Sequence, residues 1–191
     1  MVDNTNIIRG KEEIRKEMIR RLKGQAPSAR DKKSLKIQKE VLASEEFKGS
    51  RTVMAYVSLP SEVGTDQFIQ EAMERGKRIV VPYIGPDDQR IIASELTSVE
   101  ELEKGPFGIS QPGQGRFKAI PLKEIDLIVV PAIAYDKKNM RLGRGKGYYD
   151  RFLAEEGLSS ANTIGVAFNF QIVDEIPSDP HDRPVQRVIT D

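Results

Sequence analysis

Short apolar runs alternate with amphipathic stretches along the chain, and this alternation predicts a mixed α/β protein. A continuous apolar run of a few residues is typical of a buried strand, whereas apolar residues spaced three and four apart are typical of a helix. The predicted strands are 52–57, 78–83, 90–93, 126–131, 163–168 and 185–190. The predicted helices are 11–22, 29–43, one between Thr65 and Gly76, and 148–154.

The stretch 52–83 reads as strand, helix, strand and is about 30 residues long, which predicts a right-handed parallel crossover. With the later alternation, it predicts a Rossmann-like, three-layer α/β/α fold with a mostly parallel central sheet in one domain, 1–191. Ligands of such sheets bind beyond the carboxyl ends of strands. Glu62 lies just past such an end, either at a ligand site or as an acid that favours a nearby helix start.

The polar segments between these elements carry weaker signals. Ser28 and Asp31 resemble a capping box for the second helix, and Thr65 is suited to cap the third. The remaining segments are predicted as a link at 44–51, a turn at 85–89, a weak helix at 95–104, a shaped glycine-rich loop at 105–115, a connection at 171–177 and a turn at 179–184.

Composition and charge exclude several classes of protein. The formal charge of +1 gives no overall attraction to nucleic acid or membrane. The chain has no cysteine and one histidine, which removes thiolate chemistry and disfavours a zinc site. No apolar run approaches the roughly 20 residues of a membrane span. The first residues lack the pattern of a signal peptide, so a cytoplasmic location is expected.

A loop rich in glycine and basic residues follows the strand 126–131. Its glycines at 143, 145 and 147 allow positive φ angles and close approach to a ligand, and its basic side chains attract anions. A strand, such a loop and a helix from Tyr148 form an order typical of phosphate sites. It is neither a Walker loop, since Gly147 follows Lys146, nor a dinucleotide fingerprint. The alternative is a flexible, charged surface turn.

Two further features leave both a functional and a structural interpretation open. Lys11 and Arg15 lie four apart on one helical face, where like charges repel unless an anion sits between them. The alternative is a solvated helix flank. Phe107, in the loop 105–115, is either a plug over the edge of the core or a stacking platform for a flat ligand.

The stretch Arg141 to Arg151, preceded by 130–136, closely resembles the signature of the 5-formyltetrahydrofolate cyclo-ligase family, and the resemblance extends from Lys11 to Thr190. It implies an enzyme that uses ATP and Mg²⁺ to close 5-formyltetrahydrofolate to 5,10-methenyltetrahydrofolate. The reaction would proceed by phosphorylation of the formyl oxygen and release ADP and phosphate.

The resemblance also implies roles for individual residues. ATP binding falls to Lys11, Arg15, Arg141, Leu142, Gly143, Arg144, Gly145, Lys146, Gly147, Tyr148 and Tyr149. Substrate binding falls to Val57, Glu62, Phe107, Arg144, Gly145, Lys146, Gly147 and Tyr148, and magnesium binding to Asp150 and Asp182. Arg144, Lys146 and Tyr148 are the candidate catalytic residues, with Arg144 and Lys146 expected to neutralise the transferring phosphoryl group.

The chain departs from the family pattern at a few positions. Gly64 stands where an acid is common, Phe107 replaces the usual Trp or Tyr, and a usual Met is absent near Gln89. The alternative functions are another small-molecule phosphotransferase that uses the same loop, and a nucleic-acid-binding module, which the near-zero charge disfavours. The expected partner is a small-molecule substrate, without nucleic acid or membrane, for a monomer or weak homodimer.

Overall fold

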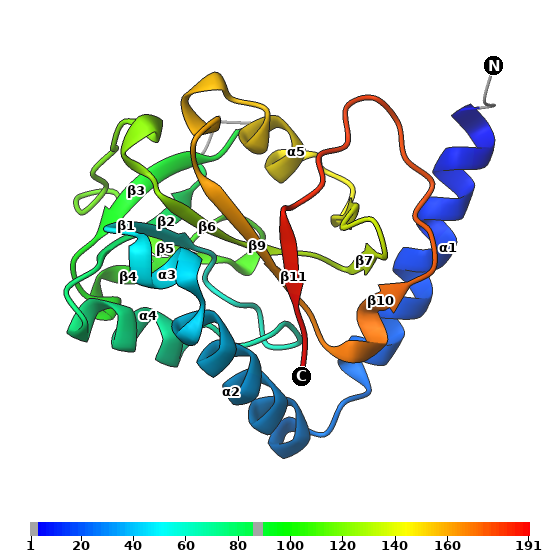
Figure 1. Ribbon diagram of the computed structural model, residues 1–191, viewed down its shortest axis with the longest axis horizontal. Helices are drawn as coiled ribbons and strands as arrows, with labels where there is room; N and C mark the ends of the chain where they lie inside the picture. The colour runs from blue at the N-terminus through cyan, green and yellow to red at the C-terminus, as the bar shows by residue number, and fades with distance from the viewer. Residues whose placement is uncertain (1–3, 86–89) are drawn as a thin grey trace.

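In the computed structural model, which describes residues 4–85 and 90–191, helices and strands alternate largely as the hydrophobic pattern predicts (Figure 1). The helices are α1 (Asn4–Lys23), α2 (Pro27–Ala43), α3 (Glu45–Gly49), α4 (Asp66–Glu74) and α5 (Tyr148–Leu153). The central strands are β1 (Thr52–Ala55), β2 (Arg78–Tyr83), β3 (Ile92–Leu96), β6 (Leu127–Pro131), β9 (Asn162–Val166) and β11 (Arg187–Ile189). The outer strands are β4 (Leu102–Lys104), β5 (Ser110–Pro112), β7 (Ala134–Asp136), β8 (Arg141–Leu142) and β10 (Ile172–Val173).

The central sheet has the strand order β11-β9-β6-β1-β2-β3. All neighbouring pairs are parallel except β2 and β3. The prediction of a mixed α/β fold with a mostly parallel central sheet is therefore confirmed. The chain moves from β1 to β2 on one side and later returns to β6 on the other side of β1. This reversal between β1 and β6 is the switch point at which open sheets form ligand crevices.

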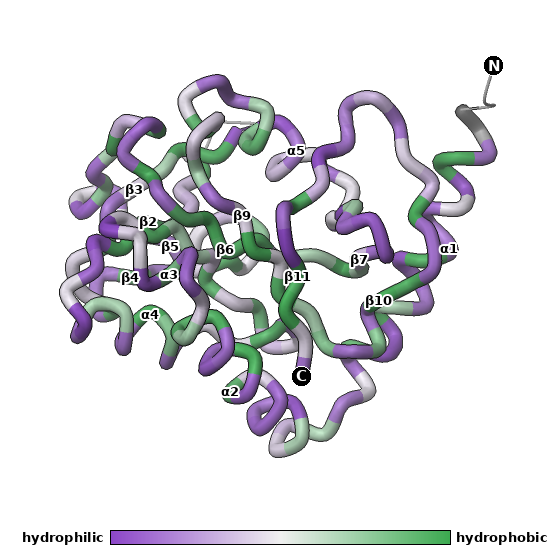
Figure 2. Tube along the Cα trace, viewed as in Figure 1, coloured by the Kyte–Doolittle hydropathy of each residue, from purple (hydrophilic) through white to green (hydrophobic). Residues whose placement is uncertain are grey.

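Strands β1, β2 and β6 are buried along most of their length because both faces of the sheet are covered. Val53 and Ile79 pack in one core with residues of α2 and α4, and Met54 and Val80 pack in a second core with Phe152 of α5. In Figure 1, α2, α3 and α4 lie on one side of the sheet and α5 on the other, and Figure 2 shows the hydrophobic residues concentrated along the central strands. Such continuous burial is typical of parallel strands.

The hairpin of β7 and β8 places the loop 143–147, which we call the glycine-rich loop, at the carboxyl edge of the sheet. Its turn is built around Asp136, whose carboxylate accepts hydrogen bonds from the N–H groups of Lys138 and Met140 at 2.8 and 2.9 Å. The other carboxylate oxygen accepts from the N–H of Ile176 at 3.1 Å. One buried acid thus connects the start of the glycine-rich loop to the C-terminal segment that carries Asp182.

The predicted helices are confirmed in position, but the first begins at Asn4 and not at residue 11, and two details of the other starts are wrong. Ser28 does not cap α2, because the helix already begins at Pro27 and its N-cap, Ala26, makes no side-chain hydrogen bond. Proline at the first helical position has a φ angle suited to a helix and lacks an N–H group. The start of α2 therefore has one N–H group fewer that needs a hydrogen-bond acceptor. Thr65 precedes α4 as expected, but its hydroxyl donates to the backbone oxygen of Tyr56 at 2.7 Å instead of capping the helix.

The weak helix predicted at 95–104 is wrong. Glu95 instead lies in β3, which pairs with β2, and its carboxylate accepts a hydrogen bond from Arg78 at 2.9 Å. This pairing partner lies outside the local window from which helicity was inferred. The predicted link before β1 contains α3, and the connection at 171–177 contains β10. Of the turn predicted at 85–89, residues 86–89 lie outside the described part of the chain, as does Gln89 of the family comparison.

Candidate active site

A cavity of about 290 Å³ opens at the carboxyl edge of the central sheet, and we call it the apolar pocket. Tyr56 and Val57 follow β1, Ala132 follows β6 and Ile84 follows β2, and all four line the cavity. The pocket therefore lies beyond the carboxyl ends of the strands, where a ligand was expected, and at the switch point between β1 and β6.

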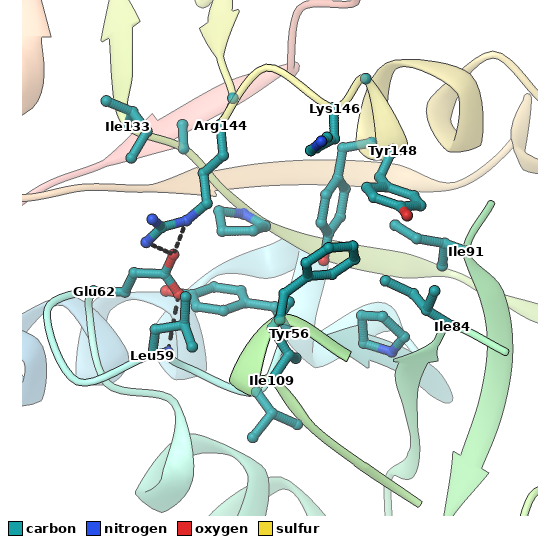
Figure 3. A pocket seen from close by; sticks show the side chains of 18 of the residues that line it. Tyr56, Leu59, Glu62, Ile84, Ile91, Ile109, Ile133, Arg144, Lys146 and Tyr148 are labelled. Atoms are coloured by element: carbon teal, nitrogen blue, oxygen red, sulfur yellow. Dashed lines mark hydrogen bonds and ion pairs between the residues drawn. The ribbon is translucent and has the colours of Figure 1, made fainter. Parts of the chain in front are cut away.

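The walls of the apolar pocket are largely hydrophobic, and its charged groups lie toward one rim. In Figure 3, Tyr56, Ile84, Ile91 and Ile109 surround the space beneath the ring of Tyr148. Glu62 and Arg144 lie together at one side, joined by dashed lines, and Lys146 descends from the glycine-rich loop. A pocket of this kind suits a flat organic ligand that carries a few polar groups.

Phe107 stands at the tip of the β4–β5 hairpin and faces Tyr148 across the mouth of the apolar pocket. Its side chain is 64% exposed, so it is not a plug over the core. The two ring centroids are 6.1 Å apart, with the planes inclined by 57°. Phe107 also has a φ of 59°, which is uncommon for a bulky residue and is retained mainly where function requires it. The structure favours the platform interpretation.

A second pocket, which we call the charged pocket, lies on the other side of the glycine-rich loop and is lined partly by α1. The Nζ of Lys11 contacts Asp182 Oδ2 at 2.5 Å and Asp179 Oδ2 at 3.0 Å. Arg15 Nε donates to the backbone oxygen of Gly143 at 2.9 Å. Lys11 is only 8% exposed, so the interpretation as a solvated helix flank is wrong. Helix α1 instead folds against the loop and places both cations at its edge.

Lys11 and Asp179 stabilise each other in their charged forms. Burial alone lowers the pKa of Lys11, but hydrogen bonds to Asp182 and Asp179 outweigh it and raise that pKa above its usual value. The pKa of Asp179 is lowered, first by the hydrogen bond from the His181 N–H and then by the one from Lys11. Lys11, Asp179 and Asp182 therefore line the charged pocket as one hydrogen-bonded cluster.

The glycine-rich loop forms the wall between the two pockets, and each of its glycines is required there. Gly145 and Gly147 have φ angles of 93° and 65°, which favour glycine. A Cβ on Gly143 would lie 2.7 Å from the guanidinium of Arg141, so a side chain at this position would require Arg141 to shift. Arg15 also donates to the loop backbone at Gly143, which anchors this part of the loop to α1.

Arg141 and Asp150 join the two ends of this loop. Arg141 Nη2 contacts Asp150 Oδ1 at 2.7 Å, and the arginine side chain is only 3% exposed. Its guanidinium lies 5.6 Å from the ring centroid of Tyr149. The Tyr149 hydroxyl is buried and has no hydrogen-bond partner among the described residues, and burial raises its pKa far above the ordinary value. Tyr149 is therefore a neutral group with unused hydrogen-bonding capacity.

Glu62 and Arg144 connect the edge of the sheet to the glycine-rich loop. Glu62 Oε1 accepts from Arg144 Nη2 at 2.8 Å, and its Oε2 accepts from the backbone N–H of Leu59 at 3.0 Å. Glu62 therefore lies in the pocket lining and not at the start of α4, which begins only at Asp66. Over the described ranges, the ammonium group of Lys146 forms no ion pair, so its charge is available to a ligand.

The two pockets sort the residues that the sequence assigned to nucleotide and substrate. The apolar pocket alone is lined by Val57, Glu62, Phe107, Arg144, Lys146, Tyr148 and Tyr149. The charged pocket alone is lined by Lys11, Arg15, Leu142, Gly145 and Asp182. Both are lined by Arg141, Gly143, Gly147 and Asp150. Tyr149, which the sequence assigned to the nucleotide, thus lines only the apolar pocket, and Gly145, which it assigned to both ligands, lines only the charged pocket.

The donors expected for magnesium lie in the charged pocket. Asp150 and Asp182 both line it, together with Asp179. Two carboxylates with phosphate oxygens and water form a sufficient ligand set for Mg²⁺, so the donors present fit this ion. In residues 4–85 and 90–191, no group of three or more His, Cys, Asp or Glu side chains is arranged to hold a metal alone. A nucleotide would have to supply the remaining ligands.

Several pocket residues were missed by the sequence analysis. Asp179 lies in the same predicted turn as Asp182, and this proximity could have identified it. Tyr56 lies at the predicted end of the first strand, where the rule of carboxyl ends applies. Gln111 carried no local signal: its side chain exchanges two hydrogen bonds with the backbone of Ile84, at 3.0 and 3.1 Å, and so fixes the β4–β5 hairpin beside the pocket.

Comparison with known proteins gives a consistent result. Residues 7–191 match the 5-formyltetrahydrofolate cyclo-ligase family. The 5-formyltetrahydrofolate cyclo-ligase of Mus musculus is 33% identical over 184 residues, which cover 92% of this chain and 91% of the mouse protein. The protein of the same name from Mycolicibacterium smegmatis is 35% identical over 144 residues, 73% of each chain.

Solved structures show the same likeness. The NMR structure of Aquifex aeolicus 5,10-methenyltetrahydrofolate synthetase matches with a TM-score of 0.81 at 30% identity, covering 94% of this chain and 89% of that one. A Mycoplasma pneumoniae 5,10-methenyltetrahydrofolate synthetase shares the fold, with a TM-score of 0.75 at 24% identity, covering 94% and 97%. Since the family match spans nearly the whole sequence, the chain belongs to the 5-formyltetrahydrofolate cyclo-ligase family.

Proposed function

We propose that this protein catalyses the ATP- and magnesium-dependent cyclisation of 5-formyltetrahydrofolate to 5,10-methenyltetrahydrofolate, with release of ADP and phosphate. The observation that carries the proposal is a wall shared by two pockets in a chain of the cyclo-ligase family. One pocket is apolar and suits a pterin, and the other has the charges that suit a nucleotide phosphate. A group can pass between two ligands where the pockets meet.

The folate is proposed to occupy the apolar pocket. Its flat ring would lie between the hydrophobic wall and the rings of Phe107 and Tyr148, which are 6.1 Å apart at their centroids. Glu62, whose carboxylate is held by Leu59 and Arg144, is positioned to accept hydrogen bonds from the amino groups of a pterin. Val57 lines the floor next to β1. This partition is supported by the residues that the sequence assigned to the substrate.

The triphosphate of ATP is proposed to occupy the charged pocket, against Lys11, Arg15 and the backbone of the glycine-rich loop. Asp150 and Asp182 would hold Mg²⁺ together with phosphate oxygens. When bound, the ion supplies neutralisation of phosphate charge. Both aspartates contact cations of the protein, Arg141 and Lys11, which orients their carboxylates toward the same pocket.

The proposed reaction begins with attack by the formyl oxygen, which is a poor leaving group until it is phosphorylated. A lone pair of this oxygen forms a bond to the γ-phosphorus, the bond from phosphorus to the bridging oxygen breaks, and its electron pair leaves with ADP. The neighbouring folate nitrogen then attacks the activated carbon. Phosphate departs with the carbon–oxygen electron pair, and the nitrogen loses its proton, which completes the ring.

The side chains of the protein are proposed to position the reactants and to neutralise charge, because phosphoryl transfer needs little covalent participation from an enzyme. Arg144 and Lys146 face the apolar pocket and would meet the phosphoryl group on the formyl oxygen. Tyr148 would hold the folate ring against them.

An assay of the purified protein with 5-formyltetrahydrofolate, ATP and Mg²⁺ tests the proposal. We expect absorbance of methenyltetrahydrofolate to appear together with stoichiometric ADP and phosphate, and to be absent without ATP. ADP formation with a phosphorylated small molecule in place of methenyltetrahydrofolate would instead identify another phosphotransferase. Strongly salt-dependent binding of RNA or DNA without turnover would identify a nucleic-acid-binding module. Either result would refute the proposed function.

The wider setting of the protein is also a proposal. We infer one Rossmann-like α/β/α domain over 1–191, an interpretation supported by hydrophobic cores on both faces of the sheet. A net charge of +1 supports a small-molecule partner over nucleic acid. Among the described helices, none has the length and apolar character of a membrane span. A cytoplasmic location and a monomeric or weakly dimeric state remain predictions from the sequence.

A further inference from the structure

The two-pocket arrangement raises the question of which cation accompanies the phosphoryl group as it leaves ATP and reaches the formyl oxygen. This question rests on the proposed function, because it assumes a nucleotide in the charged pocket and a folate in the apolar pocket. During transfer, the phosphorus is bonded partly to a group on each side. A side chain that contacts it throughout must therefore lie in the wall that both pockets share.

Most cations of the site line only one of the pockets. Those that line only the charged pocket are Lys11, Arg15, Arg151 and Arg183. Those that line only the apolar pocket are Arg144 and Lys146. Within the described part of the chain, Arg141 is the one cation that lines both. The shared wall otherwise consists of Gly143, Gly147 and the carboxylate of Asp150.

Arg141 is also held more rigidly than the other loop cations. Its side chain is 3% exposed, whereas that of Arg144 is 43% exposed. Strand β8 positions its backbone, Asp150 holds its Nη2 at 2.7 Å, and the ring of Tyr149 lies 5.6 Å from its guanidinium carbon. A charge that is already oriented stabilises developing negative charge without reorganisation during the reaction.

The guanidinium of Arg141 also has donor capacity that the protein leaves unused. Its Nε–H is buried and has no acceptor among the described residues. Buried N–H groups without a partner are rare in folded proteins and require an explanation. A guanidinium with Nη2 fixed to a carboxylate and its buried Nε–H unmet suits an oxygen of a phosphoryl group, to which it can donate a charge-assisted hydrogen bond.

We propose that Arg141 is a catalytic residue that contacts the transferring phosphoryl group from its departure from ADP until it is bonded to the formyl oxygen. The bond from the γ-phosphorus to the bridging oxygen breaks and the bond to the formyl oxygen forms while Arg141 neutralises the non-bridging oxygens. Arg144 and Lys146 contact the group only on the formyl side. The cation that contacts the phosphoryl group throughout the transfer is therefore the buried Arg141, and not the exposed Arg144.

Substitution of Arg141, combined with single-turnover kinetics, tests this assignment. We expect Arg141→Met to slow formation of ADP and of methenyltetrahydrofolate by about 10²–10³-fold at saturating ATP and folate, the usual effect of removing one preorganised electrostatic donor. Affinity for a non-hydrolysable ATP analogue should change much less than this rate. The matched control is Arg78→Met. Arg78 is also an ion-paired arginine at the start of a strand, but it lines neither pocket, so this variant should keep the wild-type rate.

Two results for Arg141→Met would overturn the assignment. One is a rate for Arg141→Met within about threefold of wild type at saturation, and the other is a defect that disappears as ATP is raised, which would limit Arg141 to binding. Should thermal unfolding show that Arg141→Met does not fold, Arg141→Lys decides, because it keeps a charge for Asp150 but loses the planar fork. A near-wild-type rate for Arg141→Lys also overturns the assignment. An inactive wild-type protein would refute the proposed function itself, whereas active variants would refute only the role of Arg141.

Discussion

The substitution Gly147→Ala tests whether turnover requires a glycine at this position of the glycine-rich loop, apart from any effect on the free energy of unfolding. Gly147 has a φ of 65° and is the N-cap of α5, and it lies in the wall shared by both pockets. A Cβ at this position would lie 2.8 Å from the guanidinium of Arg151, which must therefore shift. The change thus adds a methyl group at the boundary where transfer is proposed to occur.

The magnitude follows from the backbone angle. A left-handed conformation costs an L-residue about 1–2 kcal/mol, and the smaller entropy of the unfolded alanine chain offsets about 0.4–1 kcal/mol of this. The net loss of unfolding free energy is therefore about 1 kcal/mol, which lowers Tm by about 2–4 °C in a protein of this size. A displacement of about 1 Å at the reacting centre can cost about 10²-fold in rate, so kcat should fall far more than stability.

The matched control is Gly76→Ala. Gly76 has a φ of 75°, no atom lies within 4 Å of the Cβ that alanine would add, and the residue lines neither pocket. Thermal unfolding should give similar Tm losses for the two variants, and only Gly147→Ala should lose turnover of 5-formyltetrahydrofolate. Equal kcat values in two equally destabilised variants would show that the loop tolerates a side chain at position 147. The reasoning about the shared wall would then be refuted.

Three other outcomes are expected. Phe107→Ala should raise the KM for the folate about tenfold or more with a smaller change in kcat, because stacking on one ring contributes about 1–3 kcal/mol. Phe107→Tyr keeps a ring and should bind the folate like the wild type. An unchanged KM in both variants contradicts the platform role. Lys146→Ala should lower turnover by about 10²-fold without changing Tm, since Lys146 forms no ion pair among the described residues, and near-normal turnover rejects its role. The lowered pKa of Asp179 should add stability that is present above its unfolded-state pKa of about 4 and is lost as pH falls through the folded-state value. Denaturant unfolding of wild type and Asp179→Asn should therefore converge at acid pH, and a difference that grows on acidification contradicts this contact.

Local signals were sufficient for most elements of the fold. The apolar runs at β1, β2 and β6 indicate buried strands because a parallel sheet covered on both faces needs no polar side, and its strands lack the alternation that half-exposed strands show. The prediction was wrong at 95–104, where pairing of Glu95 and its neighbours with β2 overrides a weak helical tendency. Pairing between distant segments is invisible in a local window.

The candidate site divides in a similar way between local and distant information. The glycines of 143–147 indicate a tight anion-binding loop because their conformational freedom is a property of each residue. The contact between Lys11 and Asp182 joins positions 171 residues apart, and no periodicity in either segment predicts it. The burial of Arg141 likewise results from packing of β8, Tyr149 and Asp150, and the sequence did not separate it from the exposed Arg144.

The sequence by itself determined the class of fold and the resemblance to the cyclo-ligase family, and it predicted an anion-binding role for the loop, because these depend on residue types at short, regular spacings. Only the tertiary structure decided that the loop is a wall between an apolar and a charged pocket, and that Arg141 and Asp150 line both. The physical reason is that a pocket is formed by residues from β1, β6, α1 and the C-terminal segment, which meet only when the sheet assembles.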